Sequence, residues 1–184
     1  MTESTTTRRT FLRHAGAAGA VALAGHALGA PGAAAHPAAA APLSRTQTAT
    51  LASWCETLVP GAVAGDVGGF VNAQLAKPAD DALLMLRYLD WPPPYAGFYG
   101  EGLAALERLS ATTHRSSFAA LSRARREAVV ARVVAGDAAW SGPPSFLFYL
   151  ATRGDAVDVV YGTPEGHARI GAPYKPLVRP RARW

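Results

Sequence analysis

Several features that common protein classes require are scarce in this chain. Only one of its 184 residues is a cysteine, so an internal disulfide is excluded. That residue, Cys55, follows Trp54 in an apolar helical pattern. We interpret it as a buried small hydrophobe, with a reactive or intermolecular thiol as the alternative.

Charge and strand periodicity are scarce as well. The formal net charge is only +5 and most basic residues are scattered, so the dense basic face typical of nucleic-acid binding is missing. No stretch of useful length alternates apolar and polar side chains, which argues against a β-sheet. These absences favour an all-α protein without a nucleic-acid partner.

The motifs of common catalytic and cofactor sites are also missing. The chain has no Gly-x-Ser-x-Gly turn, no Gly-x-Gly-x-x-Gly after a strand and no Cys-x-x-Cys-His. The histidines that follow the first 35 residues, all in predicted loops or linkers, are His36, His114 and His167. No two of them have the helical spacing of metal ligands, and no Glu-x-x-His pair of a di-iron bundle occurs. We therefore expect no catalytic, cofactor-binding or metal-binding residue in this chain.

Two aspartates on the last predicted helix come nearest to a paired-carboxylate site. Asp155 and Asp158 are three residues apart, which allows both to lie on one helix face. No second pair is present to complete a metal site. We therefore interpret them as solvent-facing residues or as salt-bridge partners of Arg153.

The first 35 residues have the three-part composition of an export signal. A basic start, Thr7-Arg8-Arg9-Thr10-Phe11-Leu12-Arg13, precedes an Ala- and Gly-rich run and a small-residue end. The adjacent Arg8 and Arg9, with Phe11 and Leu12 after them, indicate the twin-arginine route, which carries folded proteins. The Ala- and Gly-rich run has too few large apolar side chains for a membrane anchor, which needs about 20 strongly apolar residues. We predict a signal peptide over residues 1–35, an Ala/Pro linker over residues 36–43 and a periplasmic or membrane-associated protein.

The chain after the linker is predicted to form one compact domain of about six helices over residues 44–161. Ser44, Asp66 and Ser122 are expected to cap helices, because each precedes apolar residues at helical spacing. Another helix is expected over residues 78–89, with Pro78 in its first turn. The remaining helices are expected over residues 96–109 and 143–161.

Two further expectations concern the end of the chain. The residues of the last helix that recur at helical spacing, and that we expect to be buried, are Phe146, Leu150, Val157 and Val160. After Tyr161, the density of Gly and Pro predicts an extended arm without regular structure over residues 162–184. This arm would pack on the domain or on a partner.

Several aromatic residues lie at positions where a small domain is not expected to bury them completely. Trp91 and Tyr95 flank a run of three prolines, and Trp184 is the last residue. Aromatic side chains are enriched at protein interfaces. The residues that we expect at a partner interface are Trp91, Tyr95, Tyr161, Tyr174 and Trp184. The crowded aromatics of residues 146–149 are instead interpreted as core.

The order of several short motifs resembles the small subunit of gluconate 2-dehydrogenase-type enzymes. The motifs are Thr57-Leu58-Val59-Pro60, Gly69-Phe70-Val71-Asn72-Ala73-Gln74-Leu75, Tyr99-Gly100-Glu101-Gly102-Leu103-Ala104-Ala105-Leu106, Phe118-Ala119-Ala120-Leu121-Ser122, and Tyr161-Gly162-Thr163 with Ile170-Gly171-Ala172-Pro173-Tyr174. They follow a twin-arginine signal, and the similarity spans roughly residue 44 to the C-terminus. The proline- and arginine-rich tail departs from the family's W-x-x-x-G-(F/Y)-P ending.

This resemblance implies a non-catalytic subunit of an exported dehydrogenase complex. Its partner would be a large subunit of the glucose–methanol–choline flavoprotein type, which binds FAD, while this chain binds no cofactor. A multihaem cytochrome c often accepts the electrons in such complexes, and the twin-arginine translocase would export the pair on this chain's signal. Two alternatives stay open from the residues alone. One is a stand-alone exported enzyme with a metal or organic cofactor, and the other is a helical assembly module of another exported complex.

Overall fold

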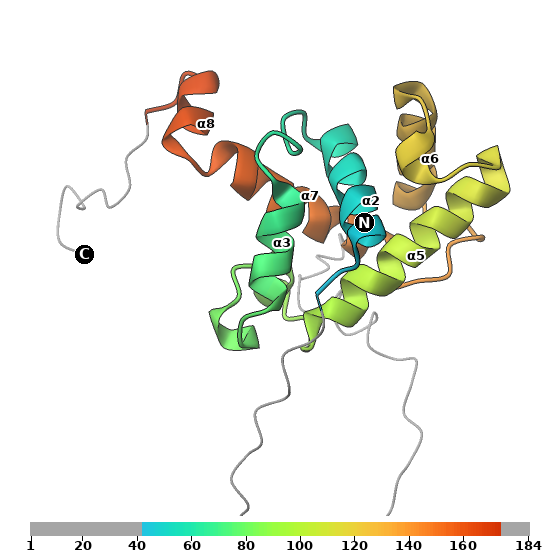
Figure 1. Ribbon diagram of the computed structural model, residues 1–184, viewed down its shortest axis with the longest axis horizontal. Coiled ribbons are helices and arrows are strands. Elements are labelled where there is room, and N and C mark those ends of the chain that lie inside the picture. Colours follow the sequence, from blue (N-terminus) through green and yellow to red (C-terminus); the bar gives the residue numbers. More distant parts are fainter. Residues whose placement is uncertain (1–41, 174–184) are drawn as a thin grey trace, which may run out of the picture. The chain divides into compact units, whose positions relative to one another are not determined.

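The computed structural model describes residues 42–173, and these are entirely helical apart from turns and connections. The prediction of an all-α fold is therefore confirmed, with seven α-helices and two 3-10 turns in this part of the chain. The α-helices are α2 (Arg45–Leu58), α3 (Val67–Leu75), α4 (Met85–Tyr88), α5 (Tyr95–His114), α6 (Arg123–Val134), α7 (Ser145–Tyr161) and α8 (Pro164–Arg169), and the 3-10 turns are η1 (Ala79–Asp81) and η2 (Phe118–Ala120) (Figure 1). The predicted signal and linker up to residue 41 lie outside the described residues.

Two helices begin at the capping residues that the sequence predicts. Ser44 forms a capping box with Gln47: the Gln47 N–H donates to Ser44 Oγ at 3.2 Å, and Gln47 Oε1 accepts from the Ser44 N–H at 2.9 Å. Asp66 accepts from the Gly69 N–H at 3.1 Å and starts α3. Ser122 also occupies the N-cap position of α6, but its side chain makes no capping hydrogen bond.

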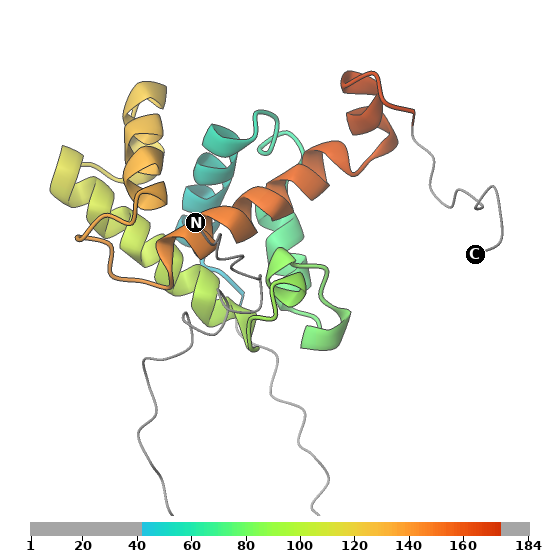
Figure 2. The ribbon, with the colours of Figure 1, turned by 180° about the vertical axis from the view of Figure 1, so that it is seen from behind.

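Helix α7 is the centre of the bundle. It contacts α2, α3, α4, α5, α6 and α8, and Figure 2 shows it lying across the other helices. Its Phe148 is fully buried, and the Phe148 ring centroid lies 5.5 Å from that of Trp54 on α2. A side chain at Gly102 would overlap the Phe148 ring, so glycine at this position lets α5 and α7 approach closely.

The single helix predicted over residues 78–89 is wrong. The chain forms η1, becomes extended at Ala82 and Leu84, and then forms only the one-turn helix α4. Two backbone N–H groups of this stretch donate to side chains of other helices: that of Leu83 to Gln74 Oε1 at 2.9 Å and that of Met85 to Asp155 Oδ1 at 2.7 Å. Tertiary hydrogen bonds therefore replace the intrahelical bonds that a continuous helix would use.

The buried face predicted for the last helix is mostly wrong. Only Val160 of the predicted set is buried, and Phe146 is 56% exposed. The buried residues of α7 are Phe148, Ala151, Thr152, Asp155, Ala156 and Val160. Because α7 is apolar on most sides, the spacing of its apolar residues does not select one face.

Three smaller expectations also fail. α5 continues past Leu109 to His114, since residues 110–114 contain neither Gly nor Pro. α8 lies within the arm predicted to be irregular. Thr163, whose side chain accepts from the Gly166 N–H at 3.0 Å, caps it. His114 and His167 lie in helices rather than in loops, and His36 lies outside the described residues. None of the helices in residues 42–173 is long and apolar enough to cross a membrane.

Candidate functional site

An apolar groove lies between α3, α4 and α7, and we call it the α4 groove. Its volume is about 510 Å³, which is within the usual range of binding clefts. Its lining residues are Gly65, Phe70, Leu83, Met85, Tyr88, Asp158, Val159 and Thr163. The side chains of Leu83 and Tyr88 are large and apolar, yet these residues are 50% and 63% exposed. The groove is therefore a surface at which apolar area stays uncovered in the described residues.

The extended stretch before α4 creates this exposure. Side chains alternate between the two sides of an extended chain, so Ala82 and Leu84 point into the core, where both are buried, while Leu83 points outward. Drawn as a helix, residues 83–89 would be apolar on most sides, and this pattern indicates burial or a covered surface. The groove itself needs the break between η1 and α4, which the pattern does not reveal.

A buried carboxylate holds this stretch in place from behind. Asp155 on α7 is fully buried and accepts hydrogen bonds from the Met85 N–H at 2.7 Å and from the Tyr99 hydroxyl at 2.5 Å. Burial raises the pKa of Asp155 to about 6, although the hydrogen bonds from Tyr99 and Met85 act in the opposite direction. Burial, together with the nearby Asp155, also raises the pKa of Tyr99. The interpretation of Asp155 as a solvent-facing residue is therefore wrong, because it fastens α4 to α5 and α7.

Asp158, one turn further along α7, has a different environment. It is exposed at the rim of the α4 groove. Partial burial by its neighbours raises the pKa of its carboxyl group. The salt bridge predicted with Arg153 is not formed, and the ion pairs within residues 42–173 are Arg123–Glu127 and Arg132–Asp137. Among the described residues, Asp158 thus has no cationic partner.

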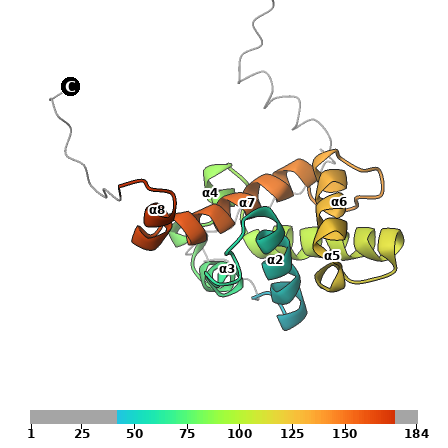
Figure 3. The ribbon, with the colours of Figure 1, turned by 90° about the horizontal axis from the view of Figure 1, so that it is seen from above.

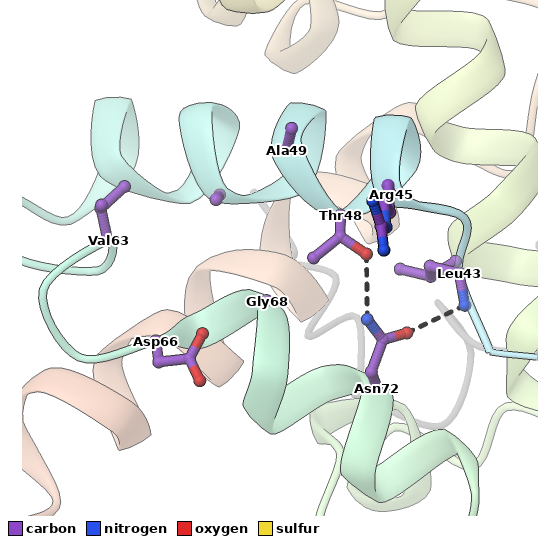
Figure 4. Close-up of a pocket in the computed structure, with 9 residues that line it drawn as sticks. Leu43, Arg45, Thr48, Ala49, Val63, Asp66, Gly68 and Asn72 are labelled. Atoms are coloured by element: carbon purple, nitrogen blue, oxygen red, sulfur yellow. Dashed lines mark hydrogen bonds between the residues drawn. The ribbon is translucent and has the colours of Figure 1, made fainter.

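A second groove, between α2 and α3, has a volume of about 460 Å³, and its lining residues Thr48, Asp66 and Asn72 make hydrogen bonds within the domain. Figure 4 shows Asn72 bridging its two sides: the side-chain oxygen accepts from the Leu43 N–H at 2.9 Å, and the side-chain nitrogen donates to Thr48 Oγ1 at 2.9 Å. Asp66, also at this groove, is engaged in capping α3. These bonds give the groove a structural role, since they tie the chain before α2 to α3.

The predicted interface residues have different positions. Trp91 is half-buried, with its ring centroid 4.9 Å from that of Phe98, and Tyr161 is half-buried at the end of α7. Tyr95 is only 8% exposed, so little of its surface is available to a partner. The predicted residues that lie outside the described residues are Tyr174, Trp184 and the signal residues Arg8, Arg9, Phe11 and Leu12.

The aromatic cluster interpreted as core divides between core and surface. Phe148 is buried as predicted, but Phe146 is 56% exposed and its ring centroid lies 5.9 Å from that of half-buried Tyr149. We call Phe146 and Tyr149 the aromatic pair. It lies near the start of α7, whereas the α4 groove borders the other end of this helix.

The lone cysteine is buried, as the sequence predicts. Cys55 has no exposed surface, and its thiol lies 3.6 Å from the backbone oxygen of Thr152. Burial raises the pKa of Cys55 well above its ordinary value, which disfavours the thiolate form. Within residues 42–173, no three His, Cys, Asp or Glu side chains converge to hold a metal ion.

These features define a small helical domain with apolar and aromatic surface suited to contacts with other polypeptide segments. The chain matches, over residues 45–180, the family described as gluconate 2-dehydrogenase subunit 3. It belongs to this family, and its role is that of an accessory subunit of a gluconate 2-dehydrogenase-type complex. The comparisons with curated proteins and with solved structures give no match.

Proposed function

We propose that this chain is the non-catalytic small subunit of an exported, FAD-dependent sugar or alcohol dehydrogenase. In this role it stabilises the flavoprotein large subunit and carries it through the twin-arginine pathway. Membership of the gluconate 2-dehydrogenase subunit 3 family is the observation that supports this proposal. The Arg8-Arg9 start of the sequence supplies the export signal for both proteins.

The partner in this proposal is a large subunit of the glucose–methanol–choline type, with FAD bound in that subunit. A multihaem cytochrome c receives the electrons, and the complex works in the periplasm or at the membrane surface. The aromatic pair is the surface that we assign to the large subunit. Aromatic residues are frequent among the few that dominate binding energy at protein interfaces, and Phe146 is exposed in this chain.

Co-expression tests the assembly part of this proposal. A tagged chain is produced together with a candidate flavoprotein large subunit of the glucose–methanol–choline type, and the large subunit retained after affinity purification is quantified with its FAD absorbance. We expect a stable pair whose yield falls strongly in Phe146→Ser. The matched control is Ile170→Ser just after α8, where an apolar residue is 60% exposed at the opposite end of α7 from the aromatic pair. The proposal would be contradicted if the chain does not retain the flavoprotein, or if the yield of the pair falls equally in both variants.

Conservative changes in the signal test the export part. We expect Arg8→Lys combined with Arg9→Lys to leave both subunits in the cytoplasm, because the twin-arginine route reads the arginine pair. Arg13→Lys retains the pair and serves as the control. Fractionation followed by immunoblotting of both subunits measures the outcome. Continued export of the flavoprotein with the double variant would show that it does not depend on this signal.

A further inference from the structure

No element within residues 42–173 covers the apolar side chains of the α4 groove. Leu83 and Tyr88 are half or more exposed there, and Phe70 lines the same groove. Asp158 adds a carboxylate that has no ion pair within residues 42–173. A segment that fills this groove would combine apolar side chains, for the aromatic and aliphatic walls, with a cation for the rim.

The charge distribution of the chain shows where such a cation is found. Residues 42–173 contain eleven Lys and Arg against twelve Asp and Glu, so this part carries a net charge of −1. Residues 174–184 contain four cations and no acidic side chain. The stretch that flanks the groove, residues 77–90, contains three aspartates against Lys77 and Arg87. The C-terminal segment is therefore complementary in charge to the groove side of the domain.

The same segment contains apolar residues and prolines. Its apolar side chains are those of Tyr174, Leu177, Val178 and Trp184. Pro176 and Pro180 favour extended backbone without an N–H donor. Proline-rich extended segments bind in grooves lined by aromatic side chains, and Phe70 and Tyr88 supply such a lining here.

The groove is within reach of this segment. Thr163 lines the groove and also caps α8, so the chain passes the groove before α8 begins. Figure 3 shows α8 at the end of α7, and its six residues span only about 9 Å. The six residues from Ile170 to Lys175 can extend up to roughly 20 Å, and the eleven residues after Pro173 up to roughly 36 Å, so Lys175 and the rest of the segment have enough chain to return past α8 to the groove.

We propose that residues 174–184 of this chain bind in the α4 groove. Their apolar and proline side chains cover Phe70, Leu83 and Tyr88, and Lys175 pairs with Asp158 at the rim. The groove is then an intramolecular docking site that stores the C-terminal segment on the small subunit. This proposal does not depend on the dehydrogenase partner, because both elements belong to one chain.

Zero-length crosslinking of the isolated full chain tests the proposal. A carbodiimide joins a carboxylate to an amine only when the two are in contact, and the chain has just two lysines, Lys77 and Lys175. Peptide mass spectrometry is expected to find Lys175 joined to Asp158. Mixing isotope-labelled and unlabelled chains is expected to show that the link forms within one chain. The link should be lost in Lys175→Arg and in Asp158→Asn.

A surface substitution separates docking from chance contact. Leu83→Arg places a cation in the groove at a half-exposed position, so we expect it to abolish the link without unfolding the domain. Val134→Arg on α6 is the matched control and should leave the link intact. Lys175 links found equally on Glu127 and Asp137 near α6, links only between different chains, or no Lys175 link at all would each overturn the proposal.

Discussion

Two aspartates one turn apart on α7 belong to two contrasting regions of the molecule. One is the interior region behind α4, and the other is the rim of the α4 groove. Asp155 lies in the interior and accepts from the Met85 N–H and the Tyr99 hydroxyl, whereas Asp158 lies at the rim of the α4 groove without an ion pair in the described residues. The same residue type therefore has two roles: Asp155 holds α4 against α5 and α7 through hydrogen bonds, while Asp158 offers a carboxylate at the groove to another segment. The role of a carboxylate in this protein therefore depends on its burial and on the hydrogen-bond donors around it.

The largest expected effect is the loss of the interior acceptor. At pH 5, where much of the Asp155 carboxyl is protonated, Asp155→Ala should lower the free energy of unfolding by about 4 kcal/mol, because the Met85 N–H and the Tyr99 hydroxyl lose their buried partner. Urea unfolding monitored by circular dichroism measures it. Asp158→Ala is the matched control. Similar costs for the two variants would remove the contrast between the regions.

The next effect is a pH dependence specific to the interior. Because burial raises the pKa of Asp155 from 3.8 to about 6, the folded state favours the protonated form. Its stabilising contribution is complete below about pH 4 and is lost as the pH rises to about 6, a change of up to about 3 kcal/mol.

Asp155→Asn isolates this dependence from the other carboxyl groups. An asparagine amide accepts from the Met85 N–H and donates to Tyr99 without titrating. The variant should therefore match the wild type near pH 4 and exceed its stability near pH 7. Chemical unfolding at a series of pH values gives the difference, and a difference that does not change with pH would contradict the assignment.

A third effect tests how tightly the interior region packs. A Cβ at Gly154 would lie 2.6 Å from Met85 Cε and 2.8 Å from Met85 Cγ. Gly154→Ala should therefore destabilise the protein by about 1 kcal/mol, since overpacking outweighs the better helix propensity of alanine. Met85→Ala combined with Gly154→Ala relieves the overlap, and a double-mutant cycle in thermal unfolding should show this coupling. Independent, additive effects would indicate that the contact is not strained.

The smallest effect is expected at the groove rim. Asp158→Asn should change the free energy of unfolding by no more than about 0.5 kcal/mol, because the residue is exposed and has no ion pair in the described residues. A loss of several kcal/mol would show that Asp158 belongs to the interior region after all.

Local signals explain which helices the sequence predicts correctly. The starts of α2 and α3 follow from Ser44 and Asp66, because a capping side chain acts within three residues of itself. The buried stripe of α5 follows from Phe98, Leu103 and Leu106, which recur at helical spacing and are all buried. Such signals need no knowledge of the rest of the fold.

The stretch before α4 and the face of α7 escape prediction for a common reason. Residues 82–84 are extended because Gln74 and Asp155, distant in sequence, accept the backbone N–H groups of Leu83 and Met85. α7 buries Thr152 because the Trp54 indole N–H donates to its hydroxyl at 2.7 Å. A periodicity search does not detect hydrogen-bond partners that only folding brings together.

The sequence by itself determined the all-α class, the capped starts of α2 and α3, the burial of Cys55 and the family to which the chain belongs. These depend on composition, on local capping chemistry and on the order of short motifs. Only the tertiary structure decided that Asp155 is internal, that Asp158 is at a rim and that Leu83 faces outward. These depend on contacts across 70 residues of chain, as between Met85 and Asp155, whose energies exist only once the helices have packed.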